Sequence, residues 1–284
     1  MFNTKPTIKK VDITTDEYYG EYEQYMSAHQ LEKYFRNPAL FHKVRSGLIT
    51  EPEKTRQEYA FGTAAHEHIL EPEEYKKNYV IVGDPPTNKS TGKGYGETSG
   101  KHKGWLAECS ELAQGKLCLS QDQHNMIVKM TESTMSNPAM MKERWLSGGK
   151  PEQTYRGELM GVKWQSRMDF VSNGGAFIVD YKTIDDIDNF EKQCKRFGYF
   201  RQAAAYTECL KNTNGLDPMA GQSKRSTFVF VVCEKKEPFR SGAFIVGETT
   251  MAENVRRIQK TLKQYRQSME TGHFPTYYEK AKVL

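Results

Sequence analysis

The chain has 284 residues, of which 37% are hydrophobic and 12% aromatic, enough for a folded core, so a generally disordered protein is excluded. Its formal net charge of +5 is compatible with a phosphate-rich partner but is too small for a purely electrostatic binder. Five scattered cysteines form no CxxC pair, which excludes a zinc ribbon and favours reduced thiols. Because the chain has no long apolar run and no secretory leader, we expect a cytoplasmic protein without a membrane span.

The first half of the chain predicts mainly helices. Residues 1–25 are polar and tyrosine-rich and suggest an irregular arm before a single domain over residues 26–284. Residues 83–104, rich in Gly, Lys, Ser and Thr, predict a mobile basic loop that lacks the GxxxxGK[ST] motif of a nucleotide-binding P-loop. A short strand is expected over 79–82. Helices are expected over 27–35 with Ser27 as N-cap, 38–45, 59–70, 106–112, 121–135 and after Pro138, which makes residues 26–150 mainly helical.

The second half, residues 151–284, changes to an alternating pattern that predicts a catalytic sheet core and a C-terminal helix. Strands are expected over 152–156, 160–171, 176–182, 226–233 and 241–246. Helices are expected over 188–196, 199–212 and 250–269. This order of elements predicts an α/β fold with a mixed central sheet flanked by helices.

A hairpin at the centre of the chain carries most of the charged residues that could do chemistry. If Asn173-Gly174 form a two-residue turn, Asp169 faces Ile178, and Asp169 and Asp180 become diagonal neighbours on one face. Two carboxylates at that separation can hold one hard divalent cation, and they repel each other without it. Lys182 projects from the same face, where its ammonium can polarise a water or stabilise a transition state. The set suits metal-assisted hydrolysis of a phosphodiester.

Arg167 faces Asp180 in this register, and two roles for it stay open. It can form an ion pair with that carboxylate, or it can contact a substrate phosphate.

The spacing of Asp169 and Asp180-Tyr181-Lys182 on a hairpin resembles the signature of the PD-(D/E)xK nucleases, although Met168 stands where proline is common. Gly62-Thr63-Ala64-Ala65-His66 resembles the GxxxH helix of the RecB-like branch. The resemblance implies a PD-(D/E)xK, restriction-endonuclease-like core. It also implies that His66, Asp169, Asp180 and the Tyr181 carbonyl hold one or two Mg²⁺ ions, with Mn²⁺ able to substitute. The cysteines do not match the pattern of the iron–sulfur members, so no cluster is expected.

Two further features match the same branch. Glu152 stands where relatives place an acidic residue on the first core strand, so the resemblance gives it, with Lys182, a catalytic role. Gln202 and Tyr206 resemble the QxxxY motif, and their spacing of four places them on one helical face. The motif implies that they touch the DNA backbone or position Lys182.

The region from Tyr18 to the C-terminus resembles the catalytic region of RecE-type exonucleases (exonuclease VIII) and related phage proteins. This implies an exodeoxyribonuclease that digests double-stranded DNA ends 5′ to 3′ for recombination in a bacterial or phage-infected cell. It also implies a ring-shaped homo-oligomer and a single-strand annealing partner of the RecT type. Two alternatives remain: an endonuclease or structure-specific nuclease on the same fold, and a non-catalytic DNA-binding protein with a relic site.

Overall fold

A mixed six-stranded sheet forms the centre of the protein in the computed structural model, which describes residues 7–21, 24–50, 56–95, 98–213 and 226–276, with the side chains of 56–60 left out. The strand order is β1-β4-β5-β6-β7-β8, with β6 and β7 parallel and the other neighbours antiparallel. The strands are β1 (Lys9–Val11), β4 (Gly149–Leu159), β5 (Val162–Ser172), β6 (Phe177–Ile184), β7 (Thr227–Glu234) and β8 (Ser241–Ile245). A parallel pair, β2 (Tyr79–Val82) and β3 (Leu117–Ser120), lies apart.

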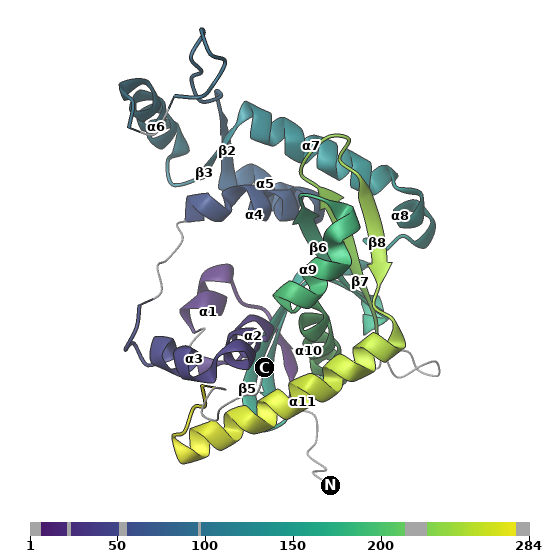
Figure 1. Ribbon diagram of the computed structural model, residues 1–284. Coiled ribbons are helices and arrows are strands. Elements are labelled where there is room, and N and C mark those ends of the chain that lie inside the picture. The colour runs from purple at the N-terminus through teal and green to yellow at the C-terminus, as the bar shows by residue number, and fades with distance from the viewer. Residues whose placement is uncertain (1–6, 22–23, 51–55, 96–97, 214–225, 277–284) are drawn as a thin grey trace, which may run out of the picture.

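Helices surround the sheet, as the sequence predicts, and the α/β fold class is confirmed (Figure 1). The first group is α1 (Thr15–Gly20), α2 (Ala28–Arg36), α3 (Pro38–Arg45), α4 (Arg56–Leu70), α5 (Pro72–Asn78) and α6 (Gly100–Ala113). The second group is α7 (Gln121–Ser136), α8 (Pro138–Glu143), α9 (Phe190–Phe197), α10 (Tyr199–Lys211) and α11 (Glu248–Thr271). Ser27 caps α2 through a capping box, as expected.

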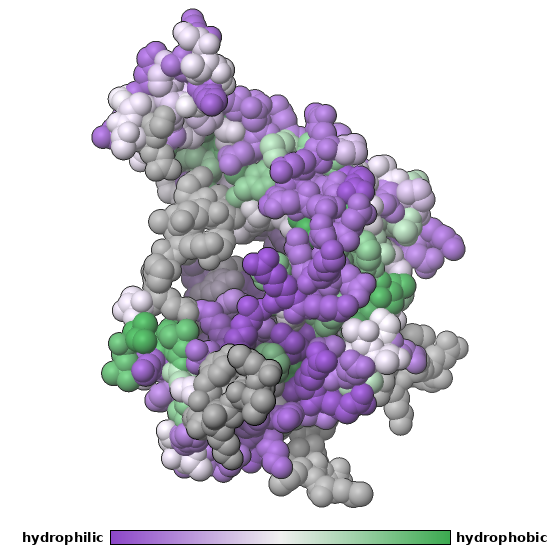
Figure 2. All heavy atoms as spheres, in the orientation of Figure 1, coloured by the Kyte–Doolittle hydropathy of each residue, from purple (hydrophilic) through white to green (hydrophobic). Residues whose placement is uncertain are grey.

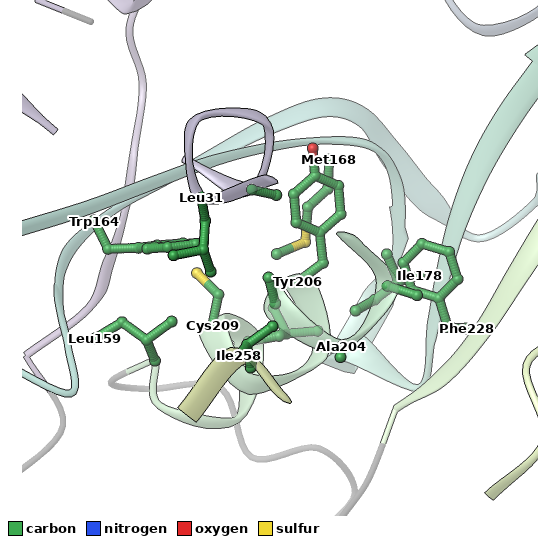
Figure 3. Close-up of a cluster of buried hydrophobic side chains, with 14 of the residues drawn as sticks. Leu31, Leu159, Trp164, Met168, Ile178, Ala204, Tyr206, Cys209, Phe228 and Ile258 are labelled. Atoms are coloured by element: carbon green, nitrogen blue, oxygen red, sulfur yellow. The ribbon is translucent and has the colours of Figure 1, made fainter. Parts of the chain in front are cut away.

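Each face of the sheet carries its own apolar cluster. On one face, residues such as Trp164, Ile178 and Phe228 pack against α2, α10 and α11, and Figure 3 shows part of this cluster around Tyr206 and Cys209. On the other face, Val179 and Tyr181 pack against α4 and α7. Successive residues of β6 therefore point into different clusters. Because both faces are covered, a polar side chain on β6 is buried unless the sheet opens beside it.

The sheet does open, at the hairpin of β5 and β6. Only two residue pairs join these strands, Phe170 with Val179 and Val171 with Ile178. The predicted two-residue turn is wrong, because a 3-10 turn over Asn173–Gly175 takes its place and shifts the register by two residues. A shift of two preserves the face of every side chain. Beyond the two pairs, β5 stays with β4 and β6 stays with β7, so the strands fork at Asp169 and Asp180.

The N-terminal segment is not the irregular arm that its composition suggests. Lys9–Val11 forms the edge strand β1 on β4, and Thr14 opens α1 with a capping box. Pairing with a strand more than a hundred residues away leaves no local periodicity, which is why the composition did not reveal it. Residues 1–6 and 22–23 of that predicted arm lie outside the described residues. The predicted basic loop also ends earlier, because α6 begins at Gly100.

Hydrophilic residues cover most of the face that Figure 2 shows, and a hollow separates the part with α4–α6 from the part with α1–α3. No helix among the described residues combines the length and apolar character needed to cross a bilayer.

Candidate active site

The fork between β5 and β6 holds two aspartates. Asp180 is fully buried, and Asp169 accepts a hydrogen bond from the backbone N–H of Tyr181, with 2.9 Å between nitrogen and Oδ2. That bond occupies an amide that β5 no longer pairs, so the carboxylate is fixed by the fork itself. Burial raises the pKa of Asp180 to about 6, and it also raises the pKa of Asp169. Two desolvated carboxylates side by side favour a bound cation.

Lys182 supplies one positive charge at this position. Its Nζ lies 2.6 Å from Asp180 Oδ2 and 4.9 Å from the centre of the Tyr199 ring. Burial alone would lower the pKa of Lys182, but the Asp180 and Asp169 carboxylates outweigh it and raise that pKa. The side chain therefore stays an ammonium near neutral pH. It can neutralise negative charge, and it is unsuited to accept a proton.

His66 approaches the aspartates from α4, on the opposite side of the sheet from α10. Its Nδ1 lies 3.4 Å from Asp169 Oδ2, and its ring stands edge-on to Tyr181 at 5.3 Å. Ala64 and Ala65, fully buried, pack this turn of α4 against the sheet. Burial, with the nearby Lys182, lowers the pKa of His66 to about 4, although a backbone hydrogen bond with Tyr181 acts in the other direction. The neutral imidazole is the form that can ligate a metal.

Glu152 completes the acidic group from β4. The pairs Pro151–Phe170 and Gln153–Met168 leave Glu152 opposite Asp169, and its φ of +44° lies in the left-handed region. Such a backbone costs about 1–3 kcal/mol in a non-glycine residue and tends to occur where function requires it. Burial, the Asp169 charge and Glu71 raise the pKa of Glu152 to about 8. A carboxyl with this pKa exchanges protons with water near neutral pH.

The QxxxY pair lies on α10, beneath the fork. Gln202 Nε2 donates to Asp180 Oδ1 at 3.1 Å and lies 3.3 Å from the Tyr206 hydroxyl oxygen. The pair therefore touches an aspartate, whereas the family resemblance offered DNA backbone or Lys182. Because Gln202 fixes one oxygen of Asp180 and Lys182 the other, the orientation of that carboxylate is set from both sides.

Arg167 does not pair with Asp180, so the facing expected from the two-residue turn is wrong. Its Nε donates to Thr154 Oγ1 at 3.0 Å and lies 3.9 Å from Glu152 Oε2. The other nitrogens donate to Thr15 Oγ1 at 2.8 Å and to the Ile13 carbonyl at 3.0 Å. With these bonds made, the guanidinium joins Glu152 to the N-terminal segment. Contact between Arg167 and a phosphate would require some of them to break.

Sequence reasoning missed three contributors to the site. The Glu67 and Glu71 carboxylates, at the end of α4, both act on Glu152. Tyr199 makes a cation–π contact with Lys182 and lies one helical turn before Gln202. The acidic residue directly after His66 and the aromatic residue three before Gln202 were the available signals.

The donor set suits a hard divalent cation. Asp180 Oδ2 is buried and accepts no hydrogen bond of good geometry, so its short contact with Lys182 is all that balances it. A neutral imidazole and several carboxylates with raised pKa values are the oxygen and nitrogen donors that Mg²⁺ or Mn²⁺ accepts. Among the described residues, no three His, Cys, Asp or Glu side chains are gathered as a ready-made metal site. The side chains would therefore adjust on binding. His66 forms a hydrogen bond with the Tyr181 backbone, and metal ligation by the Tyr181 carbonyl stays a prediction.

The comparisons with known proteins agree with this fold. The family described as a PDDEXK-like domain of unknown function (DUF3799) matches residues 21–284. The crystal structure of a "putative exonuclease" from Eubacterium rectale superposes with a TM-score of 0.61 at 16% identity, over 96% of each chain. At that identity the likeness establishes the fold alone. A search of the curated proteins finds no match. Since the family match spans nearly the whole chain, the chain belongs to this PDDEXK-like family and has its fold.

Proposed function

We propose that this protein is a nuclease, namely a Mg²⁺-dependent exodeoxyribonuclease that hydrolyses double-stranded DNA from its ends. The observation that carries the proposal is the meeting of His66, Asp169, Asp180 and Lys182 at one fork of the sheet. His66, Asp169, Asp180 and the Tyr181 carbonyl would hold one or two ions, and Mn²⁺ would substitute. A bound ion would neutralise the scissile phosphate and make a nearby water more acidic.

The chain's own residues then have separate tasks. Lys182, an ammonium held between Asp180 and the Tyr199 ring, stabilises the negative charge that grows on the phosphate oxygens. Glu152, with a pKa of about 8, can take up or release the proton of the attacking water. Gln202 keeps Asp180 in one orientation, so that the carboxylate does not rotate away.

Further properties of the proposal come from the resemblance to RecE-type exonucleases. We infer digestion from 5′ to 3′ that leaves 3′ single strands for recombination, by a homo-oligomeric ring. A single-strand annealing protein of the RecT type would receive those strands in the cytoplasm of a bacterial or phage-infected cell. Size-exclusion chromatography with light scattering tests the ring, and a monomer at working concentration would contradict it.

The activity is tested with linear duplexes labelled at either the 5′ or the 3′ end, incubated with Mg²⁺ or with EDTA. Label at the 5′ end should be released first, only with Mg²⁺, and leave a long 3′ strand. Early loss of the 3′ label would reverse the polarity.

Closed circular duplex separates the exonuclease from an endonuclease on the same fold, and it should remain uncut. Circles opened as fast as linear DNA is degraded would favour the endonuclease.

Two lysine variants test whether the protein is instead a non-catalytic protein with a relic site. Lys182→Ala should abolish the activity that wild type shows, whereas Lys195→Ala on the exposed side of α9 should retain it. Equal activity of both variants and wild type would mean that the cleavage does not come from this fork.

A further inference from the structure

Helix α1, from the N-terminal segment, is fastened beside the candidate active site. Arg167 on β5 donates to the Ile13 carbonyl just before α1 and to Thr15 in its first turn. Arg156 on β4 donates to the Glu17 carbonyl inside the helix. Since Arg167 also lies 3.9 Å from Glu152, α1 and the acidic group share one guanidinium. The position of α1 is therefore fixed relative to the reacting groups.

The two tyrosines near the end of α1 are used differently. Tyr18 is 6% exposed, and the Arg167 guanidinium lies 4.9 Å from the centre of its ring. Burial, with a smaller contribution from Tyr18, raises the pKa of Tyr206, so Tyr18 lies near the QxxxY helix. Tyr19 stands edge-on to Tyr18 with 5.2 Å between ring centres, yet 62% of it is exposed. Tyr18 is thus the anchor, and it holds the Tyr19 ring in a defined position.

The exposed ring of Tyr19 lies close to the acidic group. Its phenol interacts with the charges of Arg167, Glu152 and Asp169, and the surrounding protein atoms desolvate it enough to raise its pKa. The ring is thus exposed, while its hydroxyl lies within range of the charges of the acidic group. Figure 1 places α1 opposite α4, across the hollow visible in Figure 2. Tyr19 therefore lies on a helix that borders this hollow.

We propose that Tyr19 stacks on a nucleobase of the DNA strand being cut, next to the scissile phosphate. The proposal rests on the nuclease function proposed above and adds a substrate contact to it. Once a phosphate lies at the fork, the neighbouring base is the apolar, flat part of the substrate within reach of α1. Stacking on an aromatic ring accepts every base, as a nuclease without sequence preference requires. A tyrosine already ordered by its neighbour loses little side-chain entropy on stacking.

The contact has a consequence for the form of DNA that binds best. A base inside a duplex is stacked on its neighbours, so only an unpaired base can offer its face to Tyr19. A frayed end or a short single-stranded extension on the cut strand should therefore bind more tightly than a blunt, GC-rich end.

The experiment compares Tyr19→Ala, Tyr19→Phe and wild type on duplexes with an abasic site placed at each of the last few nucleotides of the cut strand. Phe244→Ala is the matched control, because Phe244 is an aromatic residue on β8 that is 39% exposed. Tyr19→Ala should raise KM by roughly 5- to 100-fold with little change in kcat. Tyr19→Phe, which keeps the ring, and Phe244→Ala should stay near wild type.

The abasic substrates decide whether stacking is the cause. At one position, the abasic site should raise the KM of wild type by about the same factor as Tyr19→Ala does on intact DNA. It should not raise the KM of Tyr19→Ala any further. Tyr19→Ala with unchanged KM and an unchanged circular dichroism spectrum would overturn the proposal. So would KM increases from the abasic site and from Tyr19→Ala that multiply at every abasic position.

Binding measured by fluorescence anisotropy in the Lys182→Ala background gives the same comparison without cleavage. If wild type fails to cut DNA, the proposed nuclease function fails, while the binding series still decides the role of Tyr19. If wild type cuts and the binding series shows no effect of Tyr19, only the stacking proposal fails.

Discussion

Two clusters of carboxylates surround a cation in this protein, and they differ in charge balance. At the end of β7, Arg240 donates to Glu234, with 2.7 Å to one oxygen and 3.0 Å to the other, and also bonds Asp186 and Asp188. The hydrogen bonding of Arg240 to Glu234 is the largest influence on the pKa of Glu234 and lowers it. At the fork of β5 and β6, the pKa values of Asp169, Asp180 and Glu152 are all raised, although Lys182 is present.

The difference separates a cluster that the protein itself balances from the candidate active site. Both carboxylate oxygens of Glu234 accept hydrogen bonds from one guanidinium, and one of them also accepts a hydrogen bond from the backbone N–H of Ile187. The charge of Glu234 is therefore satisfied by the protein alone. The fork buries several carboxylates around one ammonium, and burial dominates their pKa values. An additional cation would correct that imbalance.

Lys182→Ala should produce the largest change, a loss of roughly 100- to 1000-fold or more in kcat, because it removes the ammonium that lies 2.6 Å from Asp180. Single-turnover cleavage of a labelled linear duplex measures it. Arg240→Ala serves as the control, since it lies in the balanced cluster, and it should leave the rate per folded molecule unchanged. A comparable rate loss in both variants would remove the distinction between the clusters.

Gln202→Ala should raise the Mg²⁺ concentration that gives half-maximal activity by roughly 10- to 100-fold, because Asp180 loses the donor that orients it. Titration of Mg²⁺ at fixed DNA measures the change. Gln202→Glu replaces the donor with a further carboxylate and should be worse than alanine. An unchanged Mg²⁺ requirement with a lower kcat would instead mean that Gln202 contacts DNA.

Arg240→Ala should lower the melting temperature by roughly 2–4 °C, the shift expected for losing a stabilising network in a chain of this size. The variant leaves Glu234, which is 5% exposed, with its carboxylate deprived of that guanidinium. Differential scanning calorimetry measures the effect. An unaltered melting temperature would show that this cluster contributes nothing to stability.

The stability of the metal-free protein should fall as pH rises. The folded-state pKa values of Asp180 and Glu152, about 6 and about 8, exceed the unfolded values of about 4. The folded state therefore holds more protons between about pH 4 and pH 8, and stability decreases across that window. Mg²⁺ competes with those protons, so it should raise the melting temperature more at pH 8 than at pH 5. An equal Mg²⁺ shift in wild type and Asp180→Asn would contradict this.

The local parts of the site could be predicted from sequence, because each depends on residues that are close together in the chain. The hairpin pattern placed Asp169, Asp180 and Lys182 on one face, and the helical spacing placed Gln202 beside Tyr206. The register could not be fixed, since it depended on whether Ser172 to Gly175 form a tight turn or the 3-10 turn that is present. The two-residue shift also removed the expected facing of Arg167 and Asp180.

The remaining features depend on contacts between distant parts of the chain. Strand β1 exists because Lys9–Val11 pairs with β4, and β3 because four residues pair in parallel with β2. Glu152 faces Asp169 through a left-handed backbone that no sequence pattern specified. The sequence does not distinguish Tyr19 from the other tyrosines. Its position depends on Tyr18, which contacts both Tyr19 and Arg167. Tertiary pairing of this kind leaves little trace in composition or periodicity.

The central claim is that the fork binds a divalent cation between carboxylates that the protein leaves unbalanced. A crystal soaked in Mn²⁺, with anomalous difference density measured at the manganese edge, tests it most directly. We predict a peak within ligand distance of Asp169, Asp180 and His66, and no such peak in Asp180→Asn. Absence of density at the fork in wild type, with Mn²⁺ bound elsewhere or nowhere, would contradict the account.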